Sequence, residues 1–102
     1  MVPELTAEER RAASARAAEA RSARASLRRA LKAGAVDPMA ALAHPAAHRM
    51  RVRLFLTALP GVGRARAERA MAGLRISPGR RVGGLGPRQM ERLTDWIDSH
   101  EH

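Results

Sequence analysis

The sequence has no cysteine, no tyrosine and only two aromatic residues, Phe55 and Trp96. Without cysteine there is no disulfide framework, no thiolate chemistry and no cysteine-based zinc site. With so few aromatic rings, a protein that stacks the bases of single-stranded nucleic acid is not expected. A chain of 102 residues also has too little volume to enclose the deep pocket of a large enzyme.

Long hydrophobic runs are missing as well. Strongly apolar runs are no longer than about Leu54–Leu56, whereas a membrane span needs about 20 residues. Glu4, Glu8 and Glu9 precede any apolar stretch, which does not fit a secretory signal or a transit peptide. We therefore expect a soluble, cytoplasmic protein without a membrane partner.

Positive charge is abundant and unevenly placed. Lysine and arginine number 19 against 10 acidic residues, and Lys32 is the single lysine. Residues 49–92 contain eleven arginines and only Glu68 and Glu91 as acids, a net charge of +9. A segment with this charge requires an anionic partner, and phosphate polymers are the usual one.

The first third of the chain predicts one long helix. Thr6 and Glu9 form a capping-box pattern, no proline or glycine interrupts residues 7–33, and Gly34 supplies a stop. Such a helix would be about 40 Å long. Only Leu27 and Leu31 offer large apolar side chains for docking, so we expect most of it to project as an arm.

The remainder predicts a bundle of three or four short helices. Asp37 and Pro38 would open a helix that reaches about Leu42 and ends at His44–Pro45. Helical spacing then recurs in three apolar faces: Val52, Phe55, Leu56, Leu59; Ala67, Ala70, Met71, Leu74; and Met90, Leu93, Trp96, Ile97. The expected fold is all-α, with an arm at 1–34, a compact domain at 35–99 and a tail at 100–102.

A hairpin between two of these helices has the composition of a phosphate site. Gly61 and Gly63 allow unusual dihedral angles and close approach to the backbone, while Val62 would anchor the turn. The amides that open the next helix would then face an anion beside Arg64 and Arg66. Such a site contacts the nucleic-acid backbone rather than the bases. The alternative is a tight turn that needs glycine only for closure.

Three further groups of basic residues are candidate phosphate contacts. Arg80 and Arg81 stand before a glycine-rich loop, where they could clamp a phosphate or enter a minor groove. The predicted long helix carries a stripe in which basic residues fall within about 80° of one another. The stripe consists of Arg10, Arg21, Arg24, Arg28 and Lys32, and Arg49, Arg51 and Arg53 flank the next helix. The alternatives are a flexible loop and a solvated charged face.

The run LPGVGRARAERAMAGLRISPGRRVGGLG at 59–86, with RMRV upstream and the long Arg/Ala helix before it, resembles the actinobacterial-type integration host factors. The resemblance implies a long N-terminal helix on a helix-two-turns-helix module like that of ribosomal protein S13. It also implies a nucleoid-associated protein that binds duplex DNA with little sequence specificity, compacts the chromosome and supports site-specific recombination.

Carried over onto this chain, the DNA contacts would be Gly61, Val62, Gly63, Arg64, Arg66, Arg80 and Arg81. The family usually has a further basic residue two positions after the arginine pair, where this chain has Gly83. The connection at 43–48 is also shorter and more interrupted by proline than is typical. These departures imply that the loop after Arg80 and Arg81 binds DNA more weakly or differently than in the family, as in a divergent paralogue.

Other chemistries have little support. His44 and His48 have the spacing of metal ligands, but Pro45 lies between them and no third ligand is near, so we expect cap or surface histidines and no metal. No serine has a base partner in the pattern and no Walker-type lysine follows a glycine-rich loop, so we expect no enzyme, no cofactor and no small-molecule substrate.

The sequence thus predicts a monomeric, sequence-tolerant binder of duplex DNA. Gln89 is the single amide side chain, which leaves few groups for reading bases. Whether the protein bends DNA or bridges two duplexes stays open. Two alternatives also remain: an RNA-binding protein, because the S13 module binds ribosomal RNA and charge does not separate the two polymers, and a protein-interaction module that docks through its N-terminal helix.

Overall fold

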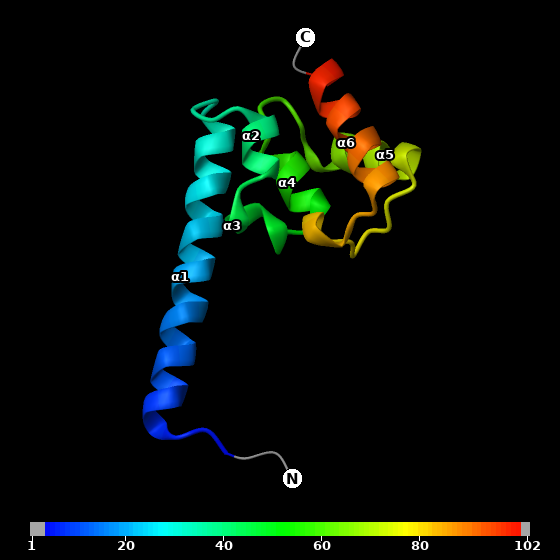
Figure 1. Cartoon of the computed structure of the whole chain (residues 1–102). Helices are drawn as coiled ribbons and strands as arrows, with labels where there is room; N and C mark the ends of the chain where they lie inside the picture. Colours follow the sequence, from blue (N-terminus) through cyan, green and yellow to red (C-terminus); the bar gives the residue numbers. More distant parts are fainter. Residues whose placement is uncertain (1–3, 101–102) are drawn as a thin grey trace.

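Helix α1 (Ala7–Lys32) dominates the computed structural model, which describes residues 4–100 (Figure 1). The predicted capping box is confirmed: the Thr6 hydroxyl accepts from the amide of Glu9 at 3.0 Å, and the Thr6 amide donates to the Glu9 carboxylate at 3.3 Å. The helix ends where predicted, just before Gly34, whose φ of +69° is the left-handed conformation that glycine adopts readily.

Within the described residues five shorter helices and a 3-10 turn follow, which confirms the all-α prediction but is one helix more than the three or four expected. They are α2 (Pro38–Leu42), α3 (Pro45–His48), α4 (Val52–Ala58), α5 (Arg64–Leu74), the turn η1 (Val82–Gly84) and α6 (Pro87–His100). Within residues 4–100 the strand-like pairing is a single isolated bridge between Arg51 and Arg81. The predicted tail at 100–102 lies mostly outside the described residues, and His100 is the last residue of α6.

The expectation for His44 and Pro45 was incomplete. These residues end α2 as predicted, but they also open α3, because the His44 ring accepts from the amide of Ala46 at 3.0 Å and Pro45 takes the first helical position. The connection between α2 and α4 is therefore helical. His44 accordingly has the predicted role of a cap.

The core is formed by the faces that the spacing predicts. Phe55, Leu56, Leu93 and Ile97 are fully buried. Leu31 is also buried and Leu27 nearly so, which confirms the two docking positions of α1. Leu74, Met90 and Trp96 are only partly buried at the edge of the core.

The first half of α1 extends beyond the bundle (Figure 1). Residues 7–23 are exposed apart from the half-buried Ala13. The molecule measures 51 × 31 × 22 Å along its principal axes, and the long dimension reflects this helix. No helix among the described residues has both the length and the apolarity needed to cross a membrane.

Two loops that are far apart in sequence pair with each other beneath the bundle. The amide of Val52 donates to the carbonyl of Arg80 at 3.0 Å, and the amide of Val82 donates to the carbonyl of Met50 at 2.9 Å. Val52 and Val82 are both buried. This pairing fixes residues 49–52 against residues 80–82, and it determines where their arginine side chains emerge.

Candidate nucleic-acid interface

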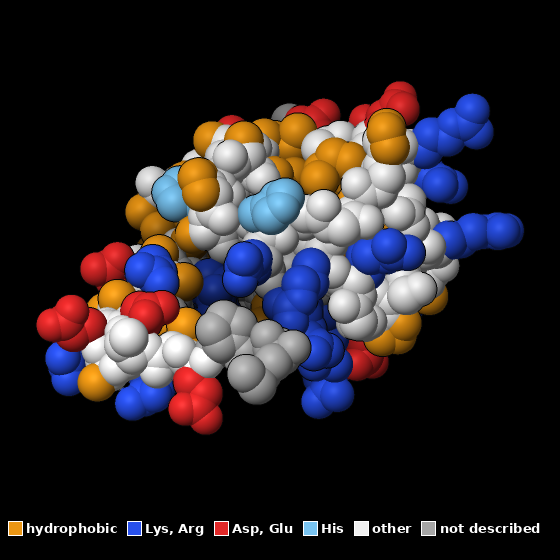
Figure 2. Space-filling view, turned by 60° about the horizontal axis from the view of Figure 1, so that its bottom comes forward, with side chains coloured by type: hydrophobic (Ala, Val, Ile, Leu, Met, Phe, Trp, Pro, Cys, Tyr) orange, Lys and Arg blue, Asp and Glu red, His pale blue; other side chains and the backbone are white. Residues whose placement is uncertain are grey.

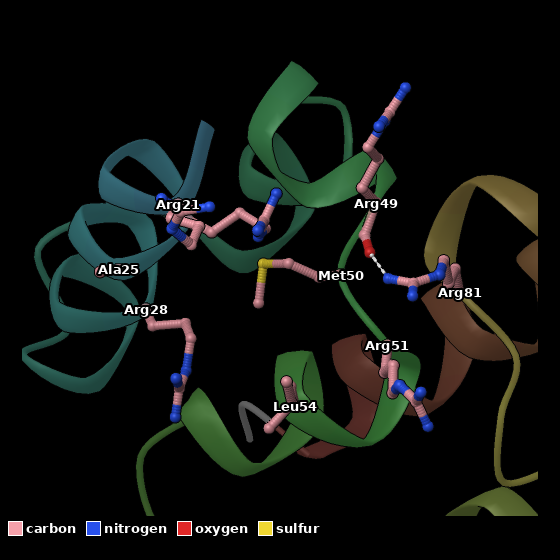
Figure 3. A pocket seen from close by; sticks show the side chains of 9 residues that line it. Arg21, Ala25, Arg28, Arg49, Met50, Arg51, Leu54 and Arg81 are labelled. Atoms are coloured by element: carbon pink, nitrogen blue, oxygen red, sulfur yellow. Dashed lines mark hydrogen bonds between the residues drawn. The ribbon is translucent and has the colours of Figure 1, made fainter. Parts of the chain in front are cut away.

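A hollow of about 260 Å³ lies between α1, the 49–51 segment and the loop at Arg81 (Figure 3). Its floor is apolar and consists of Ala25, Met50 and Leu54. Its remaining lining is entirely arginine: Arg21, Arg24, Arg28, Arg49, Arg51 and Arg81. We call this feature the arginine hollow.

Each wall of the arginine hollow has a local structural cause. Arg21, Arg24 and Arg28 are three and four residues apart, so they lie on one face of α1. The helix itself is packed against the bundle through the buried side chains of Leu27 and Leu31. The pairing of the 49–52 and 80–82 segments supplies the opposite wall. There the Arg81 guanidinium donates to the carbonyl of Arg49 at 2.5 Å (Figure 3).

All the charged side chains that line the arginine hollow are positive. No aspartate or glutamate is among its lining residues, and five of its arginines are exposed while Arg24 is half-buried. Six guanidinium groups that share one hollow repel each other, and an anion that enters it relieves this repulsion. Each guanidinium also presents a planar fork of donors that suits a phosphate.

A second hollow of about 480 Å³ continues the basic surface along the seam between α1 and α4. It is lined by Ala25, Arg28, Arg29, Lys32, Thr57 and Ala58, so it shares Ala25 and Arg28 with the arginine hollow. Lys32 donates weakly to the carbonyl of Thr57, at 3.4 Å. Figure 2 shows a face on which Lys and Arg side chains gather, with Asp and Glu mainly toward its edges. Arg29 was not among the predicted contacts, although it is in the same turn as Arg28.

The hairpin has the predicted local geometry. Gly61 has a φ of +76°. Val62 is buried as the predicted anchor, so the prediction that its side chain also contacts DNA is wrong. Gly63 is the N-cap of α5 and supplies no side-chain cap, so within the described chain the amides of residues 64–66 have no backbone partner. Helix α6 supports the turn, because the His100 ring lies 3.3 Å from the carbonyl of Pro60.

The hairpin and the arginine hollow lie at opposite ends of α4. Arg51 is the N-cap of this helix and Leu59 its C-cap, so seven helical residues, about 10 Å, separate the two features. The two predicted loop contacts take different places. The bridge to Arg51 places Arg81 in the arginine hollow, whereas the Arg80 side chain donates to the carbonyl of Gly84 at 3.2 Å.

Five of the predicted arginines lie outside the two hollows described above: Arg10 on α1, Arg80 before η1, and the three that follow. Arg64 forms an ion pair with Glu68 at 3.1 Å, in which both side chains are exposed. Arg53 is half-buried and lines a different hollow, which it shares with Glu68. Arg66 is exposed on the first turn of α5. The structure thus separates the predicted contacts into a hollow group, a hairpin group that includes Arg64 and Arg66, and three arginines in neither group, Arg10, Arg53 and Arg80.

Comparisons with known proteins agree with this architecture. A family model described as an S13-like H2TH domain matches residues 20–96. The chain is 41% identical over 101 residues to the integration host factor of Mycolicibacterium smegmatis, covering 95% of this chain and 96% of that one. It is also 41% identical over 102 residues to the integration host factor of Mycobacterium tuberculosis, covering 96% and 97% of the two chains.

A ribosomal protein and a solved structure are also similar to this chain. The small ribosomal subunit protein uS13 of Frankia casuarinae is 38% identical over 50 residues, which is 49% of this chain and 40% of that one. A solved structure of sIHF bound to an 8bp palindromic DNA has a TM-score of 0.74 at 35% identity, covering 80% of this chain and 97% of that one. These findings confirm the resemblance and the helix-two-turns-helix fold, and this family is not one of enzymes. The chain belongs to the integration host factor family, with an S13-like H2TH domain at residues 20–96.

Proposed function

We propose that this protein binds duplex DNA through the phosphate backbone, with low sequence specificity. The observation that carries the proposal is the arginine hollow, in which three separate segments bring six arginines together without an acid in the lining. The solved relative bound to DNA supports the same partner. As a member of this family, the protein would act on the nucleoid in the cytoplasm, where it compacts DNA and assists site-specific recombination.

The side chains of the chain favour backbone contacts over base contacts. Bidentate recognition of adenine uses Asn or Gln, and the single amide side chain, Gln89, is engaged internally. The side-chain oxygen Oε1 of Gln89 accepts from the backbone amide of Gly86 at 3.2 Å, and its side-chain nitrogen Nε2 donates to the backbone carbonyl of Arg75 at 3.4 Å. Arginine can hydrogen-bond guanine, but a cluster around a hollow is suited to phosphates.

The proposal also includes a simple organisation of the molecule. Residues 1–34 form a basic arm that docks through Leu27 and Leu31, and residues 35–99 form the compact binding domain. The protein acts as a monomer. The hairpin and the arginine hollow lie at opposite ends of α4, about 10 Å apart, which is less than the width of a duplex, so one duplex can contact both.

The experiment is a fluorescence-anisotropy titration with unrelated duplexes of about 25 base pairs, one AT-rich and one GC-rich, across a series of salt concentrations. We expect similar affinities for both. If about six to eight phosphates are neutralised, the logarithm of the binding constant should fall with the logarithm of salt at a slope of about −5 to −7. A preference for one sequence by orders of magnitude, or the absence of binding at low salt, would contradict the proposal.

Duplex RNA is the second candidate ligand, because part of this chain is similar to a ribosomal protein. Basic charge alone does not separate the two polymers, whereas their groove shapes differ. Competition of unlabelled duplex RNA against labelled duplex DNA at one salt concentration distinguishes them. We expect DNA to be the stronger competitor, and equal competition would remove the DNA-specific part of the proposal.

A further inference from the structure

His48 and Gly83 are in unusually close contact at the edge of the basic surface. His48 is the last residue of α3, and Gly83 is the middle residue of the turn η1. A Cβ atom built on Gly83 would lie 2.5 Å from both ring nitrogens of His48 and no farther from the carbon between them. Real Cβ atoms do not approach other heavy atoms this closely. The imidazole therefore occupies the space that a side chain at position 83 would use.

The orientation of the ring leaves its nitrogens available. The three contacted ring atoms are nearly equidistant from the Cβ position, so the ring presents its face, and not one edge, to Gly83. Imidazole nitrogens donate and accept in the plane of the ring, away from this contact.

The other described histidines are engaged. The ring of His44 accepts from the amide of Ala46, and the ring of His100 contacts the carbonyl of Pro60. The ring of His48 has no hydrogen-bond partner among residues 4–100. An exposed imidazole that lies against Gly83 and has no hydrogen-bond partner of its own is suited to a ligand from outside the chain.

The position of His48 indicates which ligand this is. His48 directly precedes Arg49, and Gly83 follows Arg81 by two residues, and both of these arginines line the arginine hollow. His48 is not among the lining residues, so we place its ring at the rim of the hollow and not inside it.

We propose that His48 is a phosphate-contact residue at the rim of the arginine hollow and that Gly83 is the residue that admits its ring. The imidazole N–H donates to a phosphodiester oxygen of duplex DNA from the place where a side chain at 83 would stand. This inference rests on the proposed function and adds to it a residue outside the arginine set. It also makes positions 48 and 83 energetically coupled.

Four variants of the full chain test the proposal by anisotropy with one duplex: His48→Ala, Gly83→Ala, the double variant, and His48→Ala combined with Gly83→Lys. His48→Ala should weaken binding about fivefold, the size of one neutral hydrogen bond. Gly83→Ala should also weaken binding, because its Cβ displaces the ring. The double variant should lose no more than His48→Ala alone, which is the signature of coupling. The lysine variant should recover affinity, because its ammonium group enters the vacated space.

Gly73→Ala is the matched control, since a Cβ there meets nothing within 4 Å, and its affinity should be unchanged. Thermal melts of every variant separate folding from binding. If His48→Ala binds DNA as the wild type does, or if the two single losses add in the double variant, the inference is wrong while the proposed function stands. If the wild type itself does not bind DNA, the proposed function fails first.

Discussion

The two glycines of the hairpin have different physical roles. Gly61 has a φ of +76°, which an L side chain adopts at a cost of about 1–2 kcal/mol. Gly63 has an ordinary φ of −86°, and a Cβ there would meet nothing within 4 Å. Gly63 is therefore dispensable for folding, but a methyl group on it would stand beside the unpaired amides that open α5.

We expect Gly61→Ala to lower the melting temperature by several degrees, because it strains the turn. We expect Gly63→Ala to leave the melting temperature within about a degree and to weaken DNA binding severalfold, because it obstructs the approach of a phosphate. Melting curves and anisotropy titrations of the two variants check this. Unchanged affinity in Gly63→Ala would show that the hairpin amides are not a phosphate site.

Arg75 has a strained backbone conformation that no sequence pattern predicted. It ends α5 with a φ of 58° and a ψ of 42°, the left-handed conformation that favours glycine. Arg75→Gly should raise the free energy of unfolding by about 0.5–1 kcal/mol, after the greater freedom of glycine in the unfolded chain is subtracted. Arg75→Ala removes the same charge but keeps the strain, so it should not stabilise the protein. Chemical denaturation measures both.

At the scale of elements, periodic patterns were reliable predictors. The capping box of Thr6 and Glu9, the stop at Gly34 and the buried face of Val52, Phe55 and Leu56 all follow from local chemistry, and the structure confirms them. These features depend on residues within a turn or two of each other. A single sequence carries that information directly.

Only one wall of the arginine hollow could be predicted from the sequence, because the other wall depends on contacts between residues that are far apart in the chain. Its α1 wall follows from helical spacing, but its other wall depends on backbone pairing between residues 49–52 and 80–82. That pairing joins segments about thirty residues apart and leaves no periodic pattern in either one. The contact of His48 with Gly83 is equally non-local. The sequence showed the departure at Gly83 but could not show the ring that lies over it.

Helix α1 is held to the bundle by very few large side chains, and the arginine hollow depends on that docking. Leu31 is 1% exposed and Leu27 8%. Leu31→Ala should destabilise the protein by about 3 kcal/mol through lost burial and a cavity. It should also reduce DNA affinity under conditions where the protein is still folded, because Arg24 and Arg28 lose their fixed position. Denaturant titration and anisotropy give the two values.

Leu5→Ala is a suitable comparison, because Leu5 is half exposed just before α1 and should cost little stability. If Leu31→Ala destabilises the protein but binds DNA as tightly as the wild type, the docked position of α1 is not needed for binding. The projecting half of the helix would then be better explained as a docking arm for another protein.

At the scale of the whole molecule, the distribution of charge matters more than its sum. The chain carries a net charge of +9, which attracts any polyanion at low salt. The structure places a large share of its arginines around the two adjoining hollows and leaves others, such as Arg11, Arg16 and Arg92, exposed elsewhere. If binding is only a general attraction of opposite charges, removing arginines from either group should weaken DNA binding equally. If the hollows form a defined phosphate site, removing the arginines around them should weaken DNA binding more.

The measurement that separates them compares two triple variants with the same loss of charge. One is Arg24→Ala/Arg28→Ala/Arg51→Ala in the arginine hollow, and the other is Arg11→Ala/Arg16→Ala/Arg92→Ala outside it. The salt dependence of duplex affinity should become shallower by about two to three units in the hollow variant, at roughly 0.9 per lost phosphate contact. The second variant should keep a slope close to that of the wild type. Equal slopes and equal affinities in the two variants would contradict the account, because the arginine hollow would then be no more than part of a generally basic surface.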